Sequence, residues 1–255
     1  MAKRALIIGL NYAGSDFELA MCEKDAHEMA RRLEKEGYAV KLRLGIYSAT
    51  DCLNDLADIR AKSTPKDTFV FYQSSHGSNT FDWSGDEKDK SDELLCYWNG
   101  KDIEYIADDD IRAALDEIQA KSKFYVLDTC YSGGMERAPI AFASKGITDV
   151  RAKVLPYDPD CVQVRYERSL TRAVKAANGK MYCLFASQED EYSYETSEGG
   201  KFTTALCRAY DAGSTMKSRR TIKYVMGQAV KGCAPMQTPV YKIFNGGASN
   251  KVLFI

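Results

Sequence analysis

The sequence is poor in the residues from which metal centres are usually built. It contains only two histidines, and its eight cysteines include no CxxC pair. Most of the cysteines lie among apolar neighbours, as reduced core thiols do in cytosolic proteins. We therefore expect a cytoplasmic protein with reduced thiols and without a structural zinc site.

Long apolar runs and an excess of one charge are also missing. The formal net charge is −1, which argues against a protein that coats nucleic acid or an anionic membrane. The first apolar run is too short for a signal peptide, because Asn11 and Asp16 follow it closely. No later run approaches the length of a transmembrane helix. We therefore expect binding neither to nucleic acid nor to a membrane.

Nucleotide-binding motifs and internal repeats are absent as well. Residues 9–14 (GLNYAG) lack both the Rossmann glycine spacing and the Lys-Ser/Thr of a P-loop. The hydrophobic content of 45% and the aromatic content of 11% are ordinary for a globular protein. The length of 255 residues fits one large α/β domain or two small ones.

Apolar strand patterns alternate with amphipathic helix patterns along most of the chain. This order is typical of a parallel sheet with helices on both faces. The predicted strands are 4–10, 38–44, 68–74, 123–128, 180–187 and 239–244, and the predicted helices are 19–36, 52–62, 108–121, 202–211 and 221–231.

Two stretches interrupt this pattern. Residues 79–101 are polar and rich in Asp, Gly and Lys, and residues 135–179 carry three prolines and many basic side chains. The weak periodicity of 135–179 predicts an exposed, flexible linker, where proteolytic nicking concentrates. The linker divides the one compact domain that we expect into a larger half, 1–134, and a smaller half, 180–255.

A cysteine and a histidine follow the ends of two predicted strands. The apolar run 124–127 leads to Cys130, and the run 68–72 leads to His76. In open α/β sheets, ligands and chemistry lie at the carboxyl ends of strands. A thiolate can attack a peptide carbonyl while an imidazole protonates the leaving amine, so we predict Cys130 as nucleophile and His76 as general acid/base. The alternatives are a buried thiol and a structural turn histidine.

Both motifs resemble those of the metacaspases and orthocaspases, which are caspase-like cysteine peptidases. Ser74-Ser75-His76-Gly77 is similar to Ser-Gly-His-Gly, with Ser75 in place of glycine. Asp128-Thr129-Cys130-Tyr131-Ser132-Gly133 is similar to Asp-x-Cys-His-Ser-Gly, with Tyr131 in place of histidine. The spacing matches the roughly fifty residues typical of caspases, although the Gln-Ala-Cys of true caspases is absent. The similarity runs from about Arg4 to Phe244.

The resemblance implies a fold and a place for the developing oxyanion. The fold is a caspase-like three-layer sandwich, with a mostly parallel six-stranded sheet and helices on both faces. The backbone N–H groups of Gly77 and Cys130 would form the oxyanion hole. A caspase-like scaffold or pseudoenzyme that only binds partners is the alternative, but both residues of the catalytic pair are present.

The resemblance also implies an acidic substrate pocket. Asp128 and Asp25 match the family's acidic pocket residues, and Ser74 and Cys22 match further residues of its wall. A buried pair of carboxylates favours a cationic side chain and disfavours an acidic one. The implied activity is an endopeptidase that cuts proteins after Arg or Lys. A solvated helix position is the alternative for Asp25.

A calcium site is a further implication of the resemblance. Metacaspases that need calcium bind it through positions that match Asp92, Asp108 and Asp109, with Glu136 near the place of a fourth ligand. Calcium takes several carboxylate or carbonyl oxygens. Acidic residues at a helix start also complement the helix dipole, and this alternative stays open.

Cleavage within 135–179 is the expected activating step, either by the enzyme itself or by an upstream protease. A solvated basic loop without a regulatory role is the alternative. The segment contains the basic residues Arg137, Lys145, Arg151, Lys153, Arg165, Arg168, Arg172 and Lys175. The candidate processing sites among them are Arg137, Lys145, Arg151, Arg165 and Arg168.

The resemblance finally suggests partners and a setting. Metacaspases, unlike caspases, are usually monomeric, so we expect a monomer. Its partners would be protein substrates with exposed Arg or Lys and an upstream activating protease. We expect a stand-alone, prokaryote-type protease core, and a role in a defence or cell-death pathway is a hypothesis.

Overall fold

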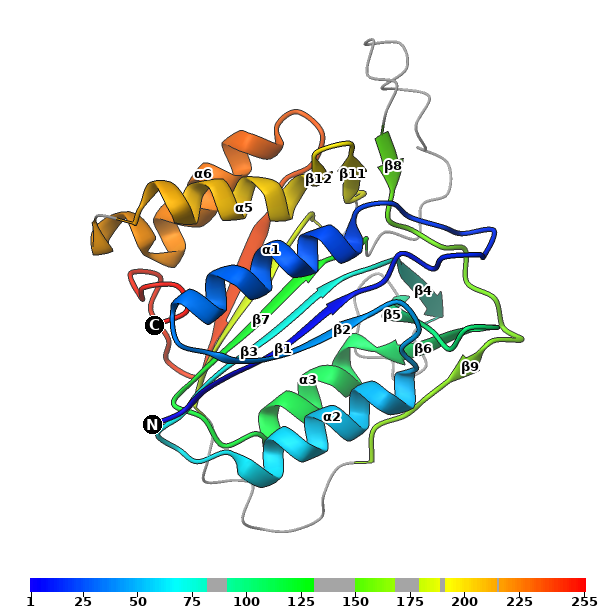
Figure 1. The fold of residues 1–255 in the computed structure, drawn as a ribbon, viewed down its shortest axis with the longest axis horizontal. Coiled ribbons are helices and arrows are strands. Elements are labelled where there is room, and N and C mark those ends of the chain that lie inside the picture. Colours follow the sequence, from blue (N-terminus) through cyan, green and yellow to red (C-terminus); the bar gives the residue numbers. More distant parts are fainter. Residues whose placement is uncertain (82–90, 131–149, 168–178, 189–190, 215) are drawn as a thin grey trace.

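A six-stranded sheet forms the centre of the computed structural model, which describes residues 1–81, 91–130, 150–167, 179–188, 191–214 and 216–255. The strand order is β13-β10-β7-β3-β1-β2 (Figure 1). All neighbouring strands are parallel except β13, which pairs antiparallel with β10. The predicted six-stranded, mostly parallel sheet is therefore confirmed. Its strands are β1 (Lys3–Gly9), β2 (Ala39–Leu44), β3 (Thr68–Ser74), β7 (Ser122–Asp128), β10 (Lys180–Phe185) and β13 (Val240–Phe244).

Helices cover both faces of this sheet (Figure 1). Successive side chains of a strand point to opposite faces. In β1, Ala5 and Ile7 join the core beneath one group of helices, whereas Leu6 and Ile8 join the core beneath the other. The first group is α1 (Cys22–Lys35), α5 (Lys201–Ala212) and α6 (Ile222–Cys233), which a short 3-10 helix, η3 (Lys217–Arg220), precedes. The second group is α2 (Ala49–Lys62) and α3 (Asp108–Glu117).

Two small sheets lie beyond the carboxyl ends of the central strands. One has the order β4-β5-β6-β9, and the other has the order β12-β11-β8. Part of the first sheet comes from the polar stretch for which the sequence pattern predicts no strands. The bounds are β4 (Gly77–Phe81), β5 (Ser91–Trp98), β6 (Ile103–Ala107), β9 (Val162–Gln163), β12 (Gly199–Gly200), β11 (Tyr194–Thr196) and β8 (Val150–Ala152).

The described part of the predicted linker, 150–167, packs against the rest of the protein. Its strand β8 pairs with β11, and its strand β9 pairs with β6. Leu155 is only 5% exposed and belongs to the core on the α2 and α3 face. This differs from the exposed linker expected from the sequence, because the side chains of Tyr157, Val164 and Tyr166 also pack against that core.

Two general expectations can be compared with the described residues. None of the eight cysteines is in a disulfide, and only Cys161 among them is not fully buried. In the described part of the chain, no helix is long and apolar enough to cross a membrane.

Candidate active site

The predicted catalytic residues leave the sheet from two adjacent strands. Strands β3 and β7 are parallel neighbours, and their last residues, Ser74 and Asp128, are paired in register. His76 and Cys130 each follow two residues later, at the same edge of the sheet. A Cβ added to Gly77 would overlap the Cys130 carbonyl, so only glycine allows the two segments to approach so closely.

The His76 ring is buried and is oriented by a backbone carbonyl. Its Nε2 lies 2.8 Å from the Phe17 carbonyl oxygen, and its ring packs against Tyr12 with centroids 4.9 Å apart. Burial lowers the pKa of His76 to about 4, although the Phe17 hydrogen bond and the nearby Lys153 backbone favour the protonated ring. The imidazole is therefore neutral at pH 7. Its Nδ1 has no hydrogen-bond partner among the described residues.

The Cys130 thiol is bound to the backbone of Ser193. It donates to the Ser193 carbonyl oxygen at 3.1 Å and accepts from the Ser193 N–H at 2.9 Å. Burial raises the pKa of Cys130 to about 12, and the Ser193 backbone only partly offsets this. The sulfur is therefore a neutral thiol at pH 7, and neither of these two hydrogen bonds goes to His76.

Two predicted pocket carboxylates surround a lysine of the chain itself. The Lys153 Nζ lies 3.2 Å from Asp25 Oδ2 and 3.1 Å from Asp128 Oδ1, and it donates to Ser74 Oγ at 2.9 Å. Lys153 and Asp128 are 0% exposed and Asp25 is 3% exposed. Burial alone would lower the pKa of Lys153, but the charge of Asp128 and its other anionic neighbours raise it above its usual value. The ammonium therefore stays charged. We call Asp25, Asp128, Ser74 and Cys22 the acidic pocket.

The backbone of Lys153 is held in the way expected of a bound substrate. Its carbonyl oxygen accepts from the N–H of Gly77 at 2.9 Å and from the N–H of Cys130 at 3.4 Å. These are the two groups predicted to form the oxyanion hole. The Lys153 N–H donates to the Ser193 carbonyl at 2.9 Å, and the Leu155 N–H donates to the Gly77 carbonyl at 2.9 Å. The peptide bond between Lys153 and Val154 therefore lies beside the Cys130 backbone.

The smaller half of the chain completes the acidic pocket. Asp128 accepts from the backbone and hydroxyl of Thr203, at 3.0 and 2.6 Å, and from the Ser193 hydroxyl at 2.8 Å. Both Asp25 oxygens accept from the Gly200 N–H, at 2.9 and 3.0 Å. A Cβ at Gly200 would lie 2.5 Å from Lys153 Nζ, so the missing side chain leaves room for the ammonium. Nothing in the residue types of the segment 199–203 indicates these hydrogen bonds.

The pocket carboxylate of Asp25 resists ionisation. Burial raises the pKa of Asp25 to about 6, and Asp128 also raises it, whereas the Lys153 charge lowers it. Cys22 is fully buried, and burial raises the pKa of its thiol, while the charge of Lys153 lowers it. Cys22 is therefore a neutral group within electrostatic range of the ammonium.

A third buried carboxylate, Glu195, fixes the start of α1. It is 2% exposed and accepts from the N–H groups of Ala20 and Met21, at 2.9 and 3.0 Å. The helix cap itself, Met21, makes no side-chain cap hydrogen bond. Because α1 carries Cys22 and Asp25, this strand residue of the smaller half positions one side of the acidic pocket. The sequence contains no signal for this role, since Glu195 lies far from α1 in the chain.

The residues implied for calcium are not assembled into a metal site by the described part of the chain. Asp92 lies in β5, and Asp108 and Asp109 begin α3, where Asp109 pairs with Arg112 at 2.5 Å. Among the described residues, no group of three or more His, Cys, Asp or Glu side chains is arranged to hold a metal ion. Glu136 lies outside the described residues. The described residues therefore hold at most part of the implied ligand set, and no step of the reaction below depends on calcium.

The candidate processing sites that the structure describes lie outside the acidic pocket, whereas Lys153 lies inside it. Arg151 lies in β8, is exposed and donates to the Glu18 carbonyl at 3.3 Å. Arg165 is also exposed and contacts Gln163. Neither arginine forms an ion pair in the acidic pocket, whereas Lys153 does. The other three candidates, Arg137, Lys145 and Arg168, lie outside the described residues.

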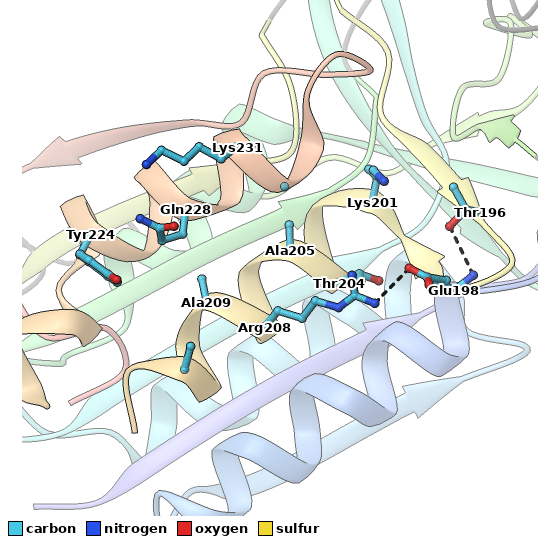
Figure 2. Close-up of a pocket in the computed structure, with 12 residues that line it drawn as sticks. Thr196, Glu198, Lys201, Thr204, Ala205, Arg208, Ala209, Tyr224, Gln228 and Lys231 are labelled. Carbon is cyan, nitrogen blue, oxygen red and sulfur yellow. Dashed lines mark hydrogen bonds and ion pairs between the residues drawn. The ribbon is translucent and has the colours of Figure 1, made fainter. Parts of the chain in front are cut away.

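A separate groove of about 440 Å³ lies between α5 and α6 (Figure 2). Its lining includes Lys201, Arg208, Tyr224 and Lys231, and Arg208 pairs with Glu198 at 3.1 Å. No residue of the catalytic pair or of the acidic pocket lines it. It therefore belongs to another surface of the molecule.

A thiol and an imidazole at adjoining strand ends, beside two N–H groups that hold a peptide carbonyl, are the arrangement of a cysteine peptidase. The family model of the Caspase domain matches residues 2–242. The chain belongs to this family.

Known relatives resemble the chain in sequence, and a solved structure resembles it in fold. Metacaspase-1 of Scheffersomyces stipitis is 30% identical over 247 residues, which cover 80% of this chain and 60% of the relative. Metacaspase-1 of Saccharomyces cerevisiae is 30% identical over 213 residues, which cover 78% and 46%. The chain thus spans less than two thirds of these relatives. A crystal structure from Geobacter sulfurreducens shares the fold, with a TM-score of 0.70, 21% identity and coverage of 95% and 93%. The chain is thus a member of the Caspase domain family that is similar in sequence to these metacaspases.

Proposed function

We propose that the protein is an endopeptidase that cuts after Lys or Arg, with Cys130 as nucleophile and His76 as general acid/base. The observation that supports this best is the position of Lys153. Its ammonium lies between Asp25 and Asp128, while its carbonyl oxygen accepts from Gly77 and Cys130. Both the ammonium group and the backbone carbonyl of this basic residue are thus bound by the site.

In the proposed reaction, the Cys130 thiol leaves Ser193 and gives its proton to His76. The receiving atom is Nδ1, because Nε2 is bonded to the Phe17 carbonyl. The thiolate attacks the carbonyl carbon, and the N–H groups of Gly77 and Cys130 stabilise the negative oxygen. His76 then protonates the leaving amine. Water hydrolyses the thioester that remains on Cys130 and restores the thiol.

Selectivity in this proposal follows from the burial of both carboxylates. An ammonium that enters the acidic pocket replaces its water with Asp25, Asp128 and Ser74. Leaving one member of a buried ion pair without its partner costs about 3–5 kcal/mol. An aspartate before the scissile bond would add a third negative charge to the pocket. We therefore expect Lys and Arg peptides to be cut and Asp peptides to be left intact.

The same contacts support a proposal for control of activity. The uncut chain fills its own acidic pocket with Lys153 and its own oxyanion hole with the Lys153 carbonyl. A second substrate cannot occupy this site until residues 150–155 leave it. We propose that the chain is made as a zymogen and cuts itself after Lys153, rather than after the exposed Arg151 or Arg165. Intact mass of wild type and Cys130→Ala would identify the cut, and a cut elsewhere or in both proteins would contradict the proposal.

A panel of short fluorogenic peptides tests the activity. Peptides ending in Lys, Arg or Asp would be compared on wild type and Cys130→Ala. Cys207→Ala is the matched control, because Cys207 is another buried thiol and lies on α5 outside the site. We expect cleavage of Lys and Arg peptides by wild type and the control only. Cleavage of Asp peptides alone would refute the proposed specificity, and activity equal in Cys130→Ala would refute the nucleophile.

Calcium dependence is a second proposal, which rests on the resemblance around Asp92, Asp108 and Asp109. The same peptide assay would be run after chelation and during calcium titration, with magnesium as the control ion. We expect activity to appear with calcium and to fall in Asp108→Asn. Activity that stays constant after chelation would remove this proposal without affecting the peptidase.

A further inference from the structure

The segment that follows Lys153 is attached to the larger half of the protein along its length. We call residues 154–167 the strap. The Leu155 side chain is buried in the core, and the Tyr157 ring lies 5.6 Å from the Tyr105 ring. Farther along, the Val164 N–H donates to the Tyr105 carbonyl at 2.8 Å. The Tyr166 hydroxyl donates to Glu117 at 2.8 Å. None of these contacts depends on an intact bond between Lys153 and Val154.

The segment before the scissile bond is held by a different set of contacts. Strand β8 pairs with β11 through Val150, Arg151 and Ala152, and the Lys153 ammonium is buried in the acidic pocket. These contacts do not require the bond between Lys153 and Val154 either. A single cut would therefore create two chain ends that stay next to each other and next to Cys130 until residues 150–153 leave the site and admit an external substrate.

Retention of both chain ends changes the free energy of cleavage. Hydrolysis of an ordinary peptide is favoured because the two products separate and gain translational freedom. Two ends that are fixed in the protein gain little of this freedom, and they meet at a high effective concentration. The leaving amine of Val154 stays where it was formed, because Leu155 and the rest of the strap hold it.

From this geometry we propose a second activity: Cys130 also re-forms the bond between Lys153 and Val154, so that cut and uncut chains interconvert. This inference rests on the proposed self-cleavage after Lys153. The activity is peptide-bond synthesis on the chain itself, and it goes beyond hydrolysis of external substrates.

The reverse reaction uses only groups that the site contains. The Cys130 thiol attacks the Lys153 carboxyl group, and a thioester forms as water leaves. The α-amine of Val154 then attacks the thioester carbonyl, so that a C–N bond forms and the C–S bond breaks. The amine proton passes through His76 to the sulfur, which restores the thiol. The net change is one amide and one water from one amine and one carboxylic acid, without an oxidant or an energy-rich co-substrate.

Oxygen-18 labelling tests the proposal. The protein would be incubated in water enriched in oxygen-18, with calcium and after chelation, and analysed by intact mass and peptide mapping. Hydrolysis places the label in the Lys153 carboxylate, and re-formation carries part of it into the Lys153 amide. We expect uncut wild-type chains to gain label at Lys153 alone. Cys130→Ala should stay unlabelled.

A loosened strap gives the second arm of the test. Tyr166→Ala removes the hydrogen bond to Glu117 and the packing of the ring. We expect a larger cut fraction and several-fold less label in the uncut chains. Tyr241→Ala is the matched control, because Tyr241 is a partly exposed tyrosine on the edge strand β13, outside the strap. It should behave as wild type.

The outcomes separate this inference from the proposed function. Complete cutting with no label in uncut chains would overturn re-formation and leave the peptidase intact. Absence of any cut at Lys153, while Lys peptides are hydrolysed, would also overturn it. Failure to hydrolyse Lys and Arg peptides under every condition would instead refute the proposed function.

Discussion

At the scale of single residues, Ser193 connects the parts of the candidate site. Its carbonyl accepts from both the Cys130 thiol and the Lys153 N–H, and its own N–H donates to the Cys130 sulfur. Its hydroxyl donates to Asp128. One residue thus contacts the nucleophile, the bound backbone and the pocket carboxylate. A shift of the Lys153 backbone against Ser193 would therefore also change the hydrogen bonds of the Cys130 thiol.

Asp128 provides the first residue-scale prediction. Asp128→Asn keeps the shape of the side chain and removes the charge that faces the ammonium. Because a broken buried ion pair costs about 3–5 kcal/mol, we expect kcat/KM for Lys peptides to fall about 100-fold or more. Asp211→Asn is the control, since Asp211 pairs with Arg32 at the surface. Equal kinetics of Asp128→Asn and wild type would contradict the acidic pocket.

Asp25 provides a prediction about pH. The pKa of Asp25 is about 6 with Lys153 bound, and the Lys153 charge lowers it, so the empty pocket should have a still higher pKa. As pH falls through this range, Asp25 gains a proton and loses its attraction for a cation. We therefore expect KM for Lys peptides to rise between pH 7 and 5. Asp25→Asn should lack this step, and the same step in that variant would assign it to another group.

Several site residues could be predicted from the sequence, and others could not. His76 and Cys130 could be predicted from the sequence because each follows a strand that contains a continuous apolar run. The Phe17 carbonyl has no side-chain signature, since every residue carries one. Lys153 is one of many basic residues in its segment, and only its ion pairs with Asp25 and Asp128 distinguish it. Such long-range pairing is a tertiary property.

At the scale of elements, the start of α1 connects the two halves of the chain. Glu195, from β11, accepts from the N–H groups that begin this helix. The carboxylate satisfies donors that would otherwise lack partners and complements the helix dipole. The same helix carries Asp25. The position of the acidic pocket relative to β11 therefore depends on this contact.

Glu195→Ala should consequently affect substrate binding as well as stability. We expect it to destabilise the fold by about 1 kcal/mol, as the loss of a helix cap does, and to raise KM for Lys peptides more than it lowers kcat. Glu104→Ala is the matched control, because Glu104 accepts from the Ala49 N–H at the start of α2, at 2.8 Å. Chemical denaturation and peptide kinetics would be measured on both variants. Similar KM changes in both would mean that Glu195 is only a structural cap.

The elements themselves were predictable to different degrees. Central strands such as β3 and β7 are buried along their whole length, so each contains a continuous apolar run. Strand β5 begins with Ser91, Asp92 and Glu93, and its apolar residues come only later, so the local sequence resembles a loop. The helix α3 ends earlier than expected, at Glu117, where the Lys123 Nζ donates to the Leu115 carbonyl at 2.9 Å.

At the scale of the whole molecule, the uncut chain is stabilised by occupying its own site. Lys153 neutralises two carboxylates that the fold holds in its interior. Without that cation, Asp25 and Asp128 would face each other without compensation, and the folded-state pKa of Asp25 would rise further. The folded state would then be least stable at pH values at which both carboxylates are ionised. Self-occupation therefore affects both access to the site and the free energy of unfolding.

Lys153→Met tests this link, because methionine keeps an unbranched apolar stem and removes the charge. We expect the variant to lose several kcal/mol of unfolding free energy at pH 7. A carboxyl group whose folded-state pKa is raised makes the folded protein bind protons more tightly than the unfolded chain, so stability should recover as pH falls from 7 toward 5. The variant should also remain uncut at this position and hydrolyse Lys peptides faster than uncut wild type, because the acidic pocket no longer holds the native lysine.

The matched control for this variant is Lys123→Met. Lys123 is also buried, at 1% exposure, but its ammonium donates to carbonyls at the end of α3 and lies far from the acidic pocket. It should lose stability without recovery at lower pH and without faster hydrolysis of Lys peptides. Denaturation at several pH values and peptide kinetics would separate the two variants. If both lysine variants lose stability with the same pH dependence, the pocket carboxylates are not coupled to Lys153. In that case the filled pocket would be a packing feature and not a block on the active site.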